Sequence, residues 1–220
     1  MLPLRRALQL TLATATVLSL TALAPPPAGS RITDSAILAE QVAWNQVDAF
    51  VARHQGLAAE ALDRDPAVVA EWWRSLPERD RLRMPGQMPD VIGNLAGVDY
   101  ASRDRSNRLM LAAQLADMEQ LATYHALGGT MAQRYAALQA IDRALNFTSV
   151  PRYLVELTDD QLPLAAISIG DLDTASMVTF AVPGMGTFTT DMQLWTRAAR
   201  NIYEAQSAAG ASRQAVVAWI

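Results

Sequence analysis

The chain contains no cysteine and no lysine. Without cysteine it forms no disulfide and cannot carry the thiol-linked lipid of a lipoprotein; an oxidising compartment is compatible with this composition but not demonstrated by it. All 18 basic residues are arginines, against 22 acidic residues, and the net charge is -4. A chain without a basic field is a poor partner for nucleic acid. The sequence therefore predicts neither a disulfide-stabilised domain nor a nucleic-acid-binding protein.

Long apolar runs are confined to the N-terminus. Arg5 and Arg6 precede an apolar run from Ala7 to Ala24, and a proline-rich segment follows at residues 25–30. A short basic region, an apolar run and small residues are the anatomy of a secretory signal. Residues 1–30 are therefore predicted to be a signal peptide or N-terminal anchor of a secreted or extracytoplasmic protein. Because residues 7–24 are marginally long enough to span a bilayer, a membrane anchor formed by them is the alternative.

Residues 31–147 are predicted to form a helical N-terminal region, because apolar residues recur there at three- and four-residue spacing. Between these helices, residues 84–97 contain five prolines and glycines and predict an ordered loop or a broken helix. Four helices are expected. The first begins near Asp34, and the second begins at Asp65-Pro66. The third runs from about Asp99 to Leu127 and is ended by Gly128-Gly129, and the fourth runs from Met131 to Leu145.

The long helix expected from Asp99 has two further predicted features. Its buried stripe comprises Leu111, Leu115, Met118 and Leu121. Its first turns contain the i,i+4 pairs Asp99/Arg103 and Asp104/Arg108. The charged segment 103–108 is thus either a solvated helix start or structural support for a functional site. In the second interpretation, Asn94 and Asn107 hold the glycine-containing loop of residues 84–97 through side-chain hydrogen bonds to the backbone.

After Asn146 the hydrophobic period changes from that of helices to that of strands. Residues 148–220 are predicted to be an α/β domain that contains only the first strands of its sheet. The strand at the end of the chain is expected to form an exposed apolar edge and to lower solubility. The expected strands span 152–157, 164–169, 176–182 and 214–220, with a helix from Thr189 or Thr190 to about Ala209.

Gly184-Met185-Gly186 follows the third expected strand and allows three interpretations. A dinucleotide fingerprint would need a third glycine where Thr189 stands. An oxyanion loop would direct backbone N–H groups at a developing negative charge, with glycines permitting close approach. The third interpretation is an ordinary turn between a strand and a helix. Trp72, Trp73 and Trp195 are predicted to be core or domain-contact aromatics.

Six segments of the chain carry a family resemblance: Glu71–Leu76, Pro89–Val98, Arg103–Arg108, Gly170–Ala175, Val182–Thr187 and Val216–Ile220. Through these segments, most of residues 65–220 resembles a family of bacterial α/β-hydrolases originally catalogued as a domain of unknown function. In that family the next elements include a nucleophile elbow of the Gly-x-Ser-x-Gly kind. The resemblance implies hydrolysis of ester or other acyl bonds of small molecules through a Ser-His-Asp/Glu triad.

The chain departs from the family pattern in two respects. Asp99 stands where family members often have proline, and no Gly-x-Ser-x-Gly occurs anywhere. The only histidines, His54 and His125, are expected at a core edge or a helix end. No triad can be assembled, so this chain is predicted to be inactive and only the oxyanion loop to be present. By analogy with the fold, the N–H of Met185 is the donor, and Gly184 and Gly186 permit its geometry.

The competing hypothesis is a non-enzymatic helical module, for binding or secretion, in which residues 34–145 are the working part. Neither hypothesis requires a cofactor or a metal. Substrate identity, signal cleavage site and oligomeric state lie beyond what this sequence determines, because one fold hosts many chemistries.

Overall fold

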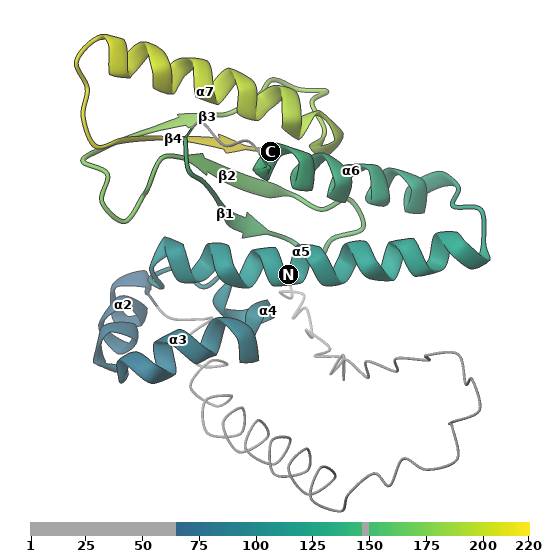
Figure 1. Cartoon of the computed structure of the whole chain (residues 1–220), viewed down its shortest axis with the longest axis horizontal. Helices are drawn as coiled ribbons and strands as arrows, with labels where there is room; N and C mark the ends of the chain where they lie inside the picture. Colours follow the sequence, from purple (N-terminus) through teal and green to yellow (C-terminus); the bar gives the residue numbers. More distant parts are fainter. Residues whose placement is uncertain (1–64, 147–149) are drawn as a thin grey trace, which may run out of the picture. The chain divides into compact units, whose positions relative to one another are not determined.

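A computed structural model of the chain describes residues 65–146 and 150–220, which belong to one compact unit (Figure 1). The predicted signal, the helix expected near Asp34 and His54 lie outside the described residues. The described elements are α2 (Pro66–Ser75), α3 (Glu78–Gln87), α4 (Pro89–Ile92), α5 (Tyr100–Tyr124), α6 (Gly129–Leu145), β1 (Arg152–Leu157), β2 (Ala165–Ile169), β3 (Met177–Ala181), η1 (Thr189–Asp191), α7 (Met192–Ala208) and β4 (Gln214–Trp219).

Helices α2, α3 and α4 form a small apolar cluster of their own. The carboxylate of Asp65 accepts a hydrogen bond from the N–H of Ala67, and Pro66 occupies the first turn of α2, as the sequence predicts. The segment 84–97 is a broken helix, because α3 ends just beyond Pro85 and Pro89 starts α4. The buried side chains of this cluster are Val69, Trp73, Met84, Met88, Ile92, Leu95 and Val98.

The long helix α5 begins at its predicted cap, since the Asp99 carboxylate accepts a hydrogen bond from the N–H of Ser102. Its predicted end is wrong. The helix stops at Tyr124 with His125 as its C-cap, and Gly128-Gly129 begins α6 instead. The apolar stripe packs only in its earlier part, since Leu111 and Met118 are buried whereas Leu121 is 39% exposed.

Only one of the two predicted ion pairs on α5 exists in the described part of the chain. The Arg108 Nε lies 2.8 Å from the Asp104 carboxylate. The Asp99/Arg103 pair is absent there, because both side chains have other partners. Asp99 caps its own helix and accepts a 2.5 Å hydrogen bond from the Trp73 indole. Arg103 donates through Nε to the carbonyl of Gly93.

The four described strands form one sheet in the order β1-β2-β4-β3. β2 is antiparallel to both of its neighbours, and β3 is parallel to β4. The prediction that residues 216–220 form an exposed edge is wrong, because β4 lies between β2 and β3. Among the described strands, β1 and β3 are the outer ones, and Phe180 of β3 is 67% exposed. Hydrophobic pattern identifies a strand but does not determine its position in the sheet.

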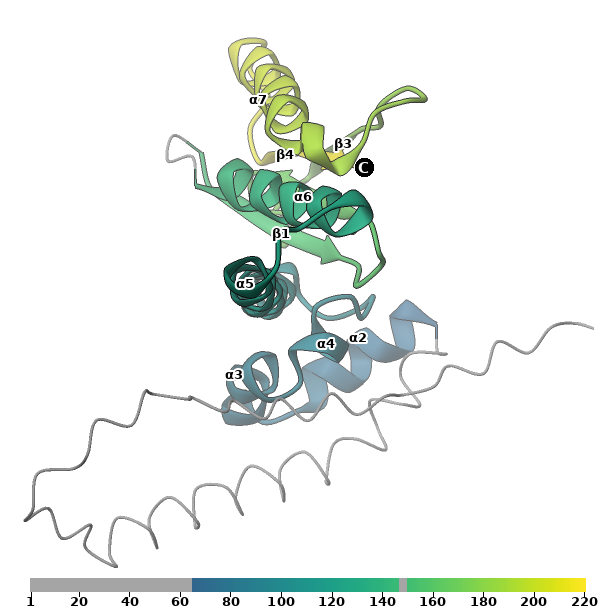
Figure 2. The ribbon, with the colours of Figure 1, turned by 90° about the vertical axis from the view of Figure 1, so that its right-hand side faces the viewer.

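Helices α6 and α7 cover one face of the sheet, and their apolar side chains join those of β1, β2 and β4 in the main core. Figure 2 shows α5 alongside β1, between the sheet and helices α2, α3 and α4. On the opposite face, Val155, Ala166 and Val217 form a smaller cluster. The register pairs Phe180 with Val217, so the exposed Phe180 continues this smaller cluster toward the open edge.

Candidate functional site

The loop between β3 and α7 carries the predicted site residues and is held at both ends. At its start, the buried Ala181 accepts a 2.9 Å hydrogen bond from the Trp195 indole of α7. At its end, the Thr189 hydroxyl donates to the carbonyl of Pro163 at 2.6 Å. The Asp191 carboxylate also accepts from the N–H of Phe188. The segment 182–187 is therefore short and positioned by contacts on either side of it.

Gly184, Met185 and Gly186 lie at the exposed tip of this loop. Met185 is fully exposed, and a Cβ added at either glycine would meet no atom within 4 Å. Gly186 has φ +86°, a left-handed conformation that favours glycine. Within residues 65–146 and 150–220, no backbone hydrogen bond involves the amides of these three residues. These N–H groups are therefore available to an external acceptor.

The sequence of the loop does not favour a dinucleotide site. Two residues, Thr187 and Phe188, separate Gly186 from the helical turn η1, which leads directly into α7. Thr189 stands where the dinucleotide fingerprint has its third glycine, and its hydroxyl donates to the carbonyl of Pro163. Chemically, residues 182–187 can donate hydrogen bonds from their backbone, and their one polar side chain is the hydroxyl of Thr187.

The other residues singled out from the sequence are structural where they are described. Trp73 is buried, and Trp72 packs against the same cluster. Trp195 packs against the main core. His125 is exposed at the end of α5, where its N–H bonds to the carbonyl of Leu121. Of these four residues, Trp195 contacts the start of the β3–α7 loop, because its indole N–H donates to the carbonyl of Ala181, the last residue of β3.

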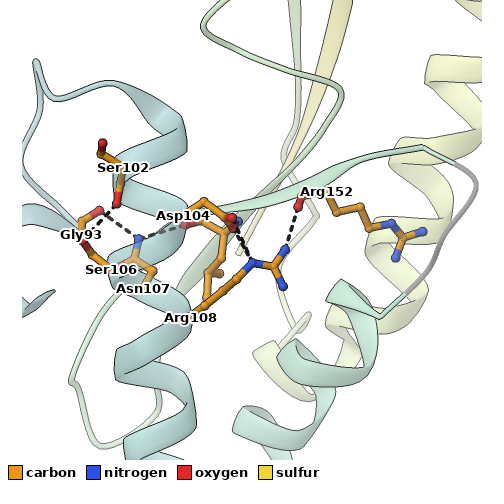
Figure 3. A network of polar contacts seen from close by, with 8 residues as sticks. Gly93, Ser102, Asp104, Ser106, Asn107, Arg108 and Arg152 are labelled. Atoms are coloured by element: carbon orange, nitrogen blue, oxygen red, sulfur yellow. Dashed lines mark hydrogen bonds and ion pairs between the residues drawn. The ribbon is translucent and has the colours of Figure 1, made fainter. Parts of the chain in front are cut away.

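A network of polar side chains holds the outer edge of β1 (Figure 3). Asp104 accepts a 2.6 Å hydrogen bond from the N–H of Leu154, and Asn107 donates to the carbonyl of the same residue. Arg108 donates to the carbonyl of Arg152 at 2.7 Å. The charged segment 103–108 thus supports the sheet rather than forming a solvated helix start. Burial raises the pKa of Asp104, while the Leu154 N–H and Arg108 oppose that shift.

Asn94 completes the cover of this edge. Its side-chain amide both donates to the carbonyl of Leu157 at 2.7 Å and accepts from the N–H of the same residue at 3.0 Å. A bulge between Leu154 and Glu156 turns Leu157 toward this amide. The prediction that both asparagines hold the glycine-containing loop through side-chain hydrogen bonds to backbone groups is confirmed. Asn107 also donates to the carbonyl of Gly93, and Asn94, which belongs to that loop, anchors it to β1. Sequence spacing gave no indication of this role for Asn94.

Asp173, in the turn between β2 and β3, holds the N-terminus of α5. Its two carboxylate oxygens accept from the N–H groups of Tyr100 and Ala101, at 2.9 and 3.0 Å. The positive end of the helix dipole favours this carboxylate. Burial nevertheless raises the pKa of Asp173, against the lowering effect of the two N–H groups. The Gly170–Ala175 motif therefore joins the sheet to the helix, a role that its sequence does not reveal.

We expect Asp173→Ala to lower the free energy of unfolding by about 1 kcal/mol at acidic pH, because the N–H groups of Tyr100 and Ala101 lose their side-chain acceptor. Burial raises the pKa of Asp173 in the folded state, so part of the wild-type stability is lost as pH rises from about 3.8 through the folded pKa, and the alanine variant has no such loss. The stability difference between wild type and variant should therefore shrink over that interval. Urea unfolding at a series of pH values measures it, with the exposed Asp160→Ala as control.

No group of three or more metal-ligating side chains occurs among the described residues. In the same part of the chain, no helix combines the length and apolarity needed to cross a membrane.

Residues 159–220, from the turn before β2 to the end of β4, match the model of a family described as alpha/beta hydrolase. No curated protein and no solved structure matches the chain. The helices followed by a mixed four-stranded sheet confirm the predicted α/β fold class. The match supports placing residues 159–220 in an alpha/beta-hydrolase family.

Proposed function

We propose that residues 159–220 supply the oxyanion loop of a serine hydrolase acting on ester or other acyl bonds of small molecules. The observation that carries the proposal is that the N–H groups of Gly184–Gly186 make no backbone hydrogen bond within the described residues. These residues lie in a loop anchored at Ala181 and Thr189. The family match over the same residues supports it. The nucleophile, base and acid of the triad would belong to a longer polypeptide, because no Gly-x-Ser-x-Gly occurs in these 220 residues.

In that reaction a serine oxygen attacks the acyl carbonyl carbon, and negative charge develops on the carbonyl oxygen. The N–H of Met185 would donate a hydrogen bond to this oxygen. The side chain of Met185 is not required for that role. Gly186 at φ +86° would set the direction of the Met185 peptide, and Gly184 leaves the approach open. Such a preorganised donor acts most strongly in the transition state, where the charge is greatest.

The edge of β3 is consistent with a longer polypeptide. Strand edges that remain unpaired are usually protected by charge, proline or a bulge. β1 has charged side chains, a bulge and five side-chain hydrogen bonds from α5 and Asn94. β3 has no charged or proline residue within Met177–Ala181, and its register with β4 is regular. A further strand paired with β3 would satisfy this edge.

The competing proposal, a helical binding module, receives less support from the described helices. Four of their polar side chains are used internally, since Asp104, Asn107 and Arg108 hold β1 and Asp99 binds Trp73. These contacts make α5 part of the support for the sheet. The helical region therefore serves the α/β domain in this proposal.

A hydrolysis assay tests the proposal. The 220-residue chain should not turn over p-nitrophenyl butyrate, because an oxyanion loop alone provides no nucleophile. A polypeptide extended along the same reading frame through a Gly-x-Ser-x-Gly elbow should hydrolyse this ester and lose activity after treatment with a serine-directed fluorophosphonate. Turnover by the 220-residue chain, or inactivity of a folded extended protein toward all acyl esters supplied, would contradict it.

We also propose an extracytoplasmic location, which rests on the signal-like residues 1–30. A cleaved or anchored N-terminus would place the described domain outside the cytoplasm in either case. Mass spectrometry of the mature N-terminus distinguishes these two outcomes. An intact Met1 on soluble cytoplasmic protein would contradict the proposed location.

A further inference from the structure

The hydroxyl of Thr189 links the β3–α7 loop to a separate segment of the chain. Thr189 begins η1 and is 5% exposed, and its hydroxyl donates to the carbonyl of the buried Pro163 in the β1–β2 loop at 2.6 Å. Among the described residues, this is the one hydrogen bond that joins residues 183–191 to a segment other than α7. The two loops that it connects are 26 positions apart at this contact.

The two ends of the β3–α7 loop are held in different ways. At the first end, Ala181 belongs to the paired strand β3 and also accepts from the Trp195 indole. At the second end, the contacts between Phe188 and Asp191 are local, because they join residues three positions apart. Local contacts define the shape of a turn but do not tie it to another loop. The Thr189 hydroxyl therefore fixes the second end against the β1–β2 loop.

Residues 183–187, between these two ends, have no hydrogen-bonded support of their own. Within the described part of the chain, neither their backbone nor their side chains make a hydrogen bond. Met185, in the middle of this segment, is fully exposed. A segment with few contacts opens and moves easily, so its conformation depends on where its ends are held. A displacement of Thr189 would therefore move the N–H of Met185.

We propose, on the basis of the function proposed above, that Thr189 is a positioning residue for the oxyanion-binding N–H of Met185. A hydrogen-bond donor displaced by about 1 Å stabilises the developing charge much less, although the substrate still binds. Loss of the Thr189 hydroxyl should therefore lower kcat and leave KM nearly unchanged, because the weakened interaction is made in the transition state. A purely structural role would instead reduce the amount of folded protein and leave kcat per folded active site unchanged.

Thr189→Val tests this proposal, because valine has nearly the shape of threonine but lacks the hydroxyl. In the extended protein, we expect kcat per fluorophosphonate-titrated site to fall about 10–100-fold. Thr189→Ser keeps the hydroxyl and should restore most of kcat. The matched control is Thr196→Val, because Thr196 is fully buried and its hydroxyl bonds only to carbonyls of its own helix α7. This control should lower the thermal unfolding midpoint without changing kcat.

The 220-residue chain provides a second measurement that does not require catalysis. In backbone amide NMR experiments, Thr189→Val should shift the resonances of residues 184–187 and increase their motion. Thr189→Ser and Thr196→Val should leave these amides as they are in the wild type. If Thr189→Val does not fold, Thr189→Ala gives the same comparison, because alanine also lacks the hydroxyl and is smaller.

The outcomes separate this inference from the proposed function. Unchanged loop amides or a normal kcat in a folded Thr189→Val protein would overturn the positioning role, as would an equal fall in kcat in Thr196→Val. An extended wild-type protein that hydrolyses no acyl ester would contradict the proposed function. The amide measurements on the 220-residue chain would then still decide whether the Thr189 hydroxyl positions the loop.

Discussion

Gly186→Val should reduce kcat on the order of 10²–10³-fold in a protein extended through the catalytic triad, with a much smaller effect on folding. Gly186 has φ +86°, which a β-branched residue does not hold without strain. The loop should therefore change conformation and move the Met185 N–H away from the developing oxyanion. Because a Cβ at this position would meet no atom within 4 Å, the sheet and α7 should be unaffected. Steady-state kinetics and a thermal unfolding midpoint measure the two effects.

Two variants control this experiment. Met185→Ala keeps the backbone N–H and should retain most of kcat. Gly184→Ala adds a Cβ where there is open space, without a positive φ to disturb, and should also be mild. Near-normal turnover by a normally folded Gly186→Val protein would show that this loop does not bind the oxyanion. If the variant unfolds, retained kcat in Gly186→Ala would give the same answer, because alanine is strained at this φ but is less bulky.

Gly93→Ala should destabilise the 220-residue chain by about 2–3 kcal/mol. An added Cβ would lie 2.1 Å from Oδ1 of Asn107, which is buried and bonded to the carbonyls of Gly93 and Leu154. Asn107 cannot move aside without leaving those carbonyls short of a donor. The clash therefore weakens the support of β1 as well as the local turn. Urea unfolding measures the loss through the transition midpoint at constant slope.

The matched control is Gly86→Ala, because Gly86 lies within α3 and an added Cβ would meet nothing within 4 Å. This variant should be neutral or stabilise the protein by up to about 1 kcal/mol. Asn107→Ala should itself cost about 1–3 kcal/mol through lost buried hydrogen bonds. The double variant Gly93→Ala/Asn107→Ala should cost at least about 1 kcal/mol less than the sum of the two. Additive losses would show that the clash with Asn107 is not the cause.

Local elements of this fold were predictable because their signals lie within a few residues of one another. The cap at Asp65-Pro66 and the cap at Asp99 both start helices, and β1 spans its predicted residues. The glycine-containing loop was also predictable, since its position between a strand and a helix follows from the change in hydrophobic period. Whether its amides bind an oxyanion depends on atoms outside the described residues.

The remaining features depend on pairings between distant residues. Nothing near Asn94 indicates that its amide binds Leu157, which is 63 positions away. The sequence singles out Asp173 only as part of the Gly170–Ala175 segment of the family resemblance, although it holds α5 across 73 positions. The position of β4 was predicted wrongly for the same reason, because its partners β2 and β3 are distant in sequence and no residue near β4 indicates them. A single sequence contains no record of such partners.

The position of β4 has a consequence for synthesis on the ribosome. β3 emerges before β4, yet β4 is its only partner among the described strands. β2 pairs with β1 on one side and with β4 on the other, so it also lacks one partner until β4 has been made. β1 and β2 can pair early, because they are neighbours in both sequence and sheet. β3 and α7 must instead wait until Gln214–Trp219 has left the exit tunnel. During that interval the apolar β3 would depend on chaperones to avoid association with other nascent chains.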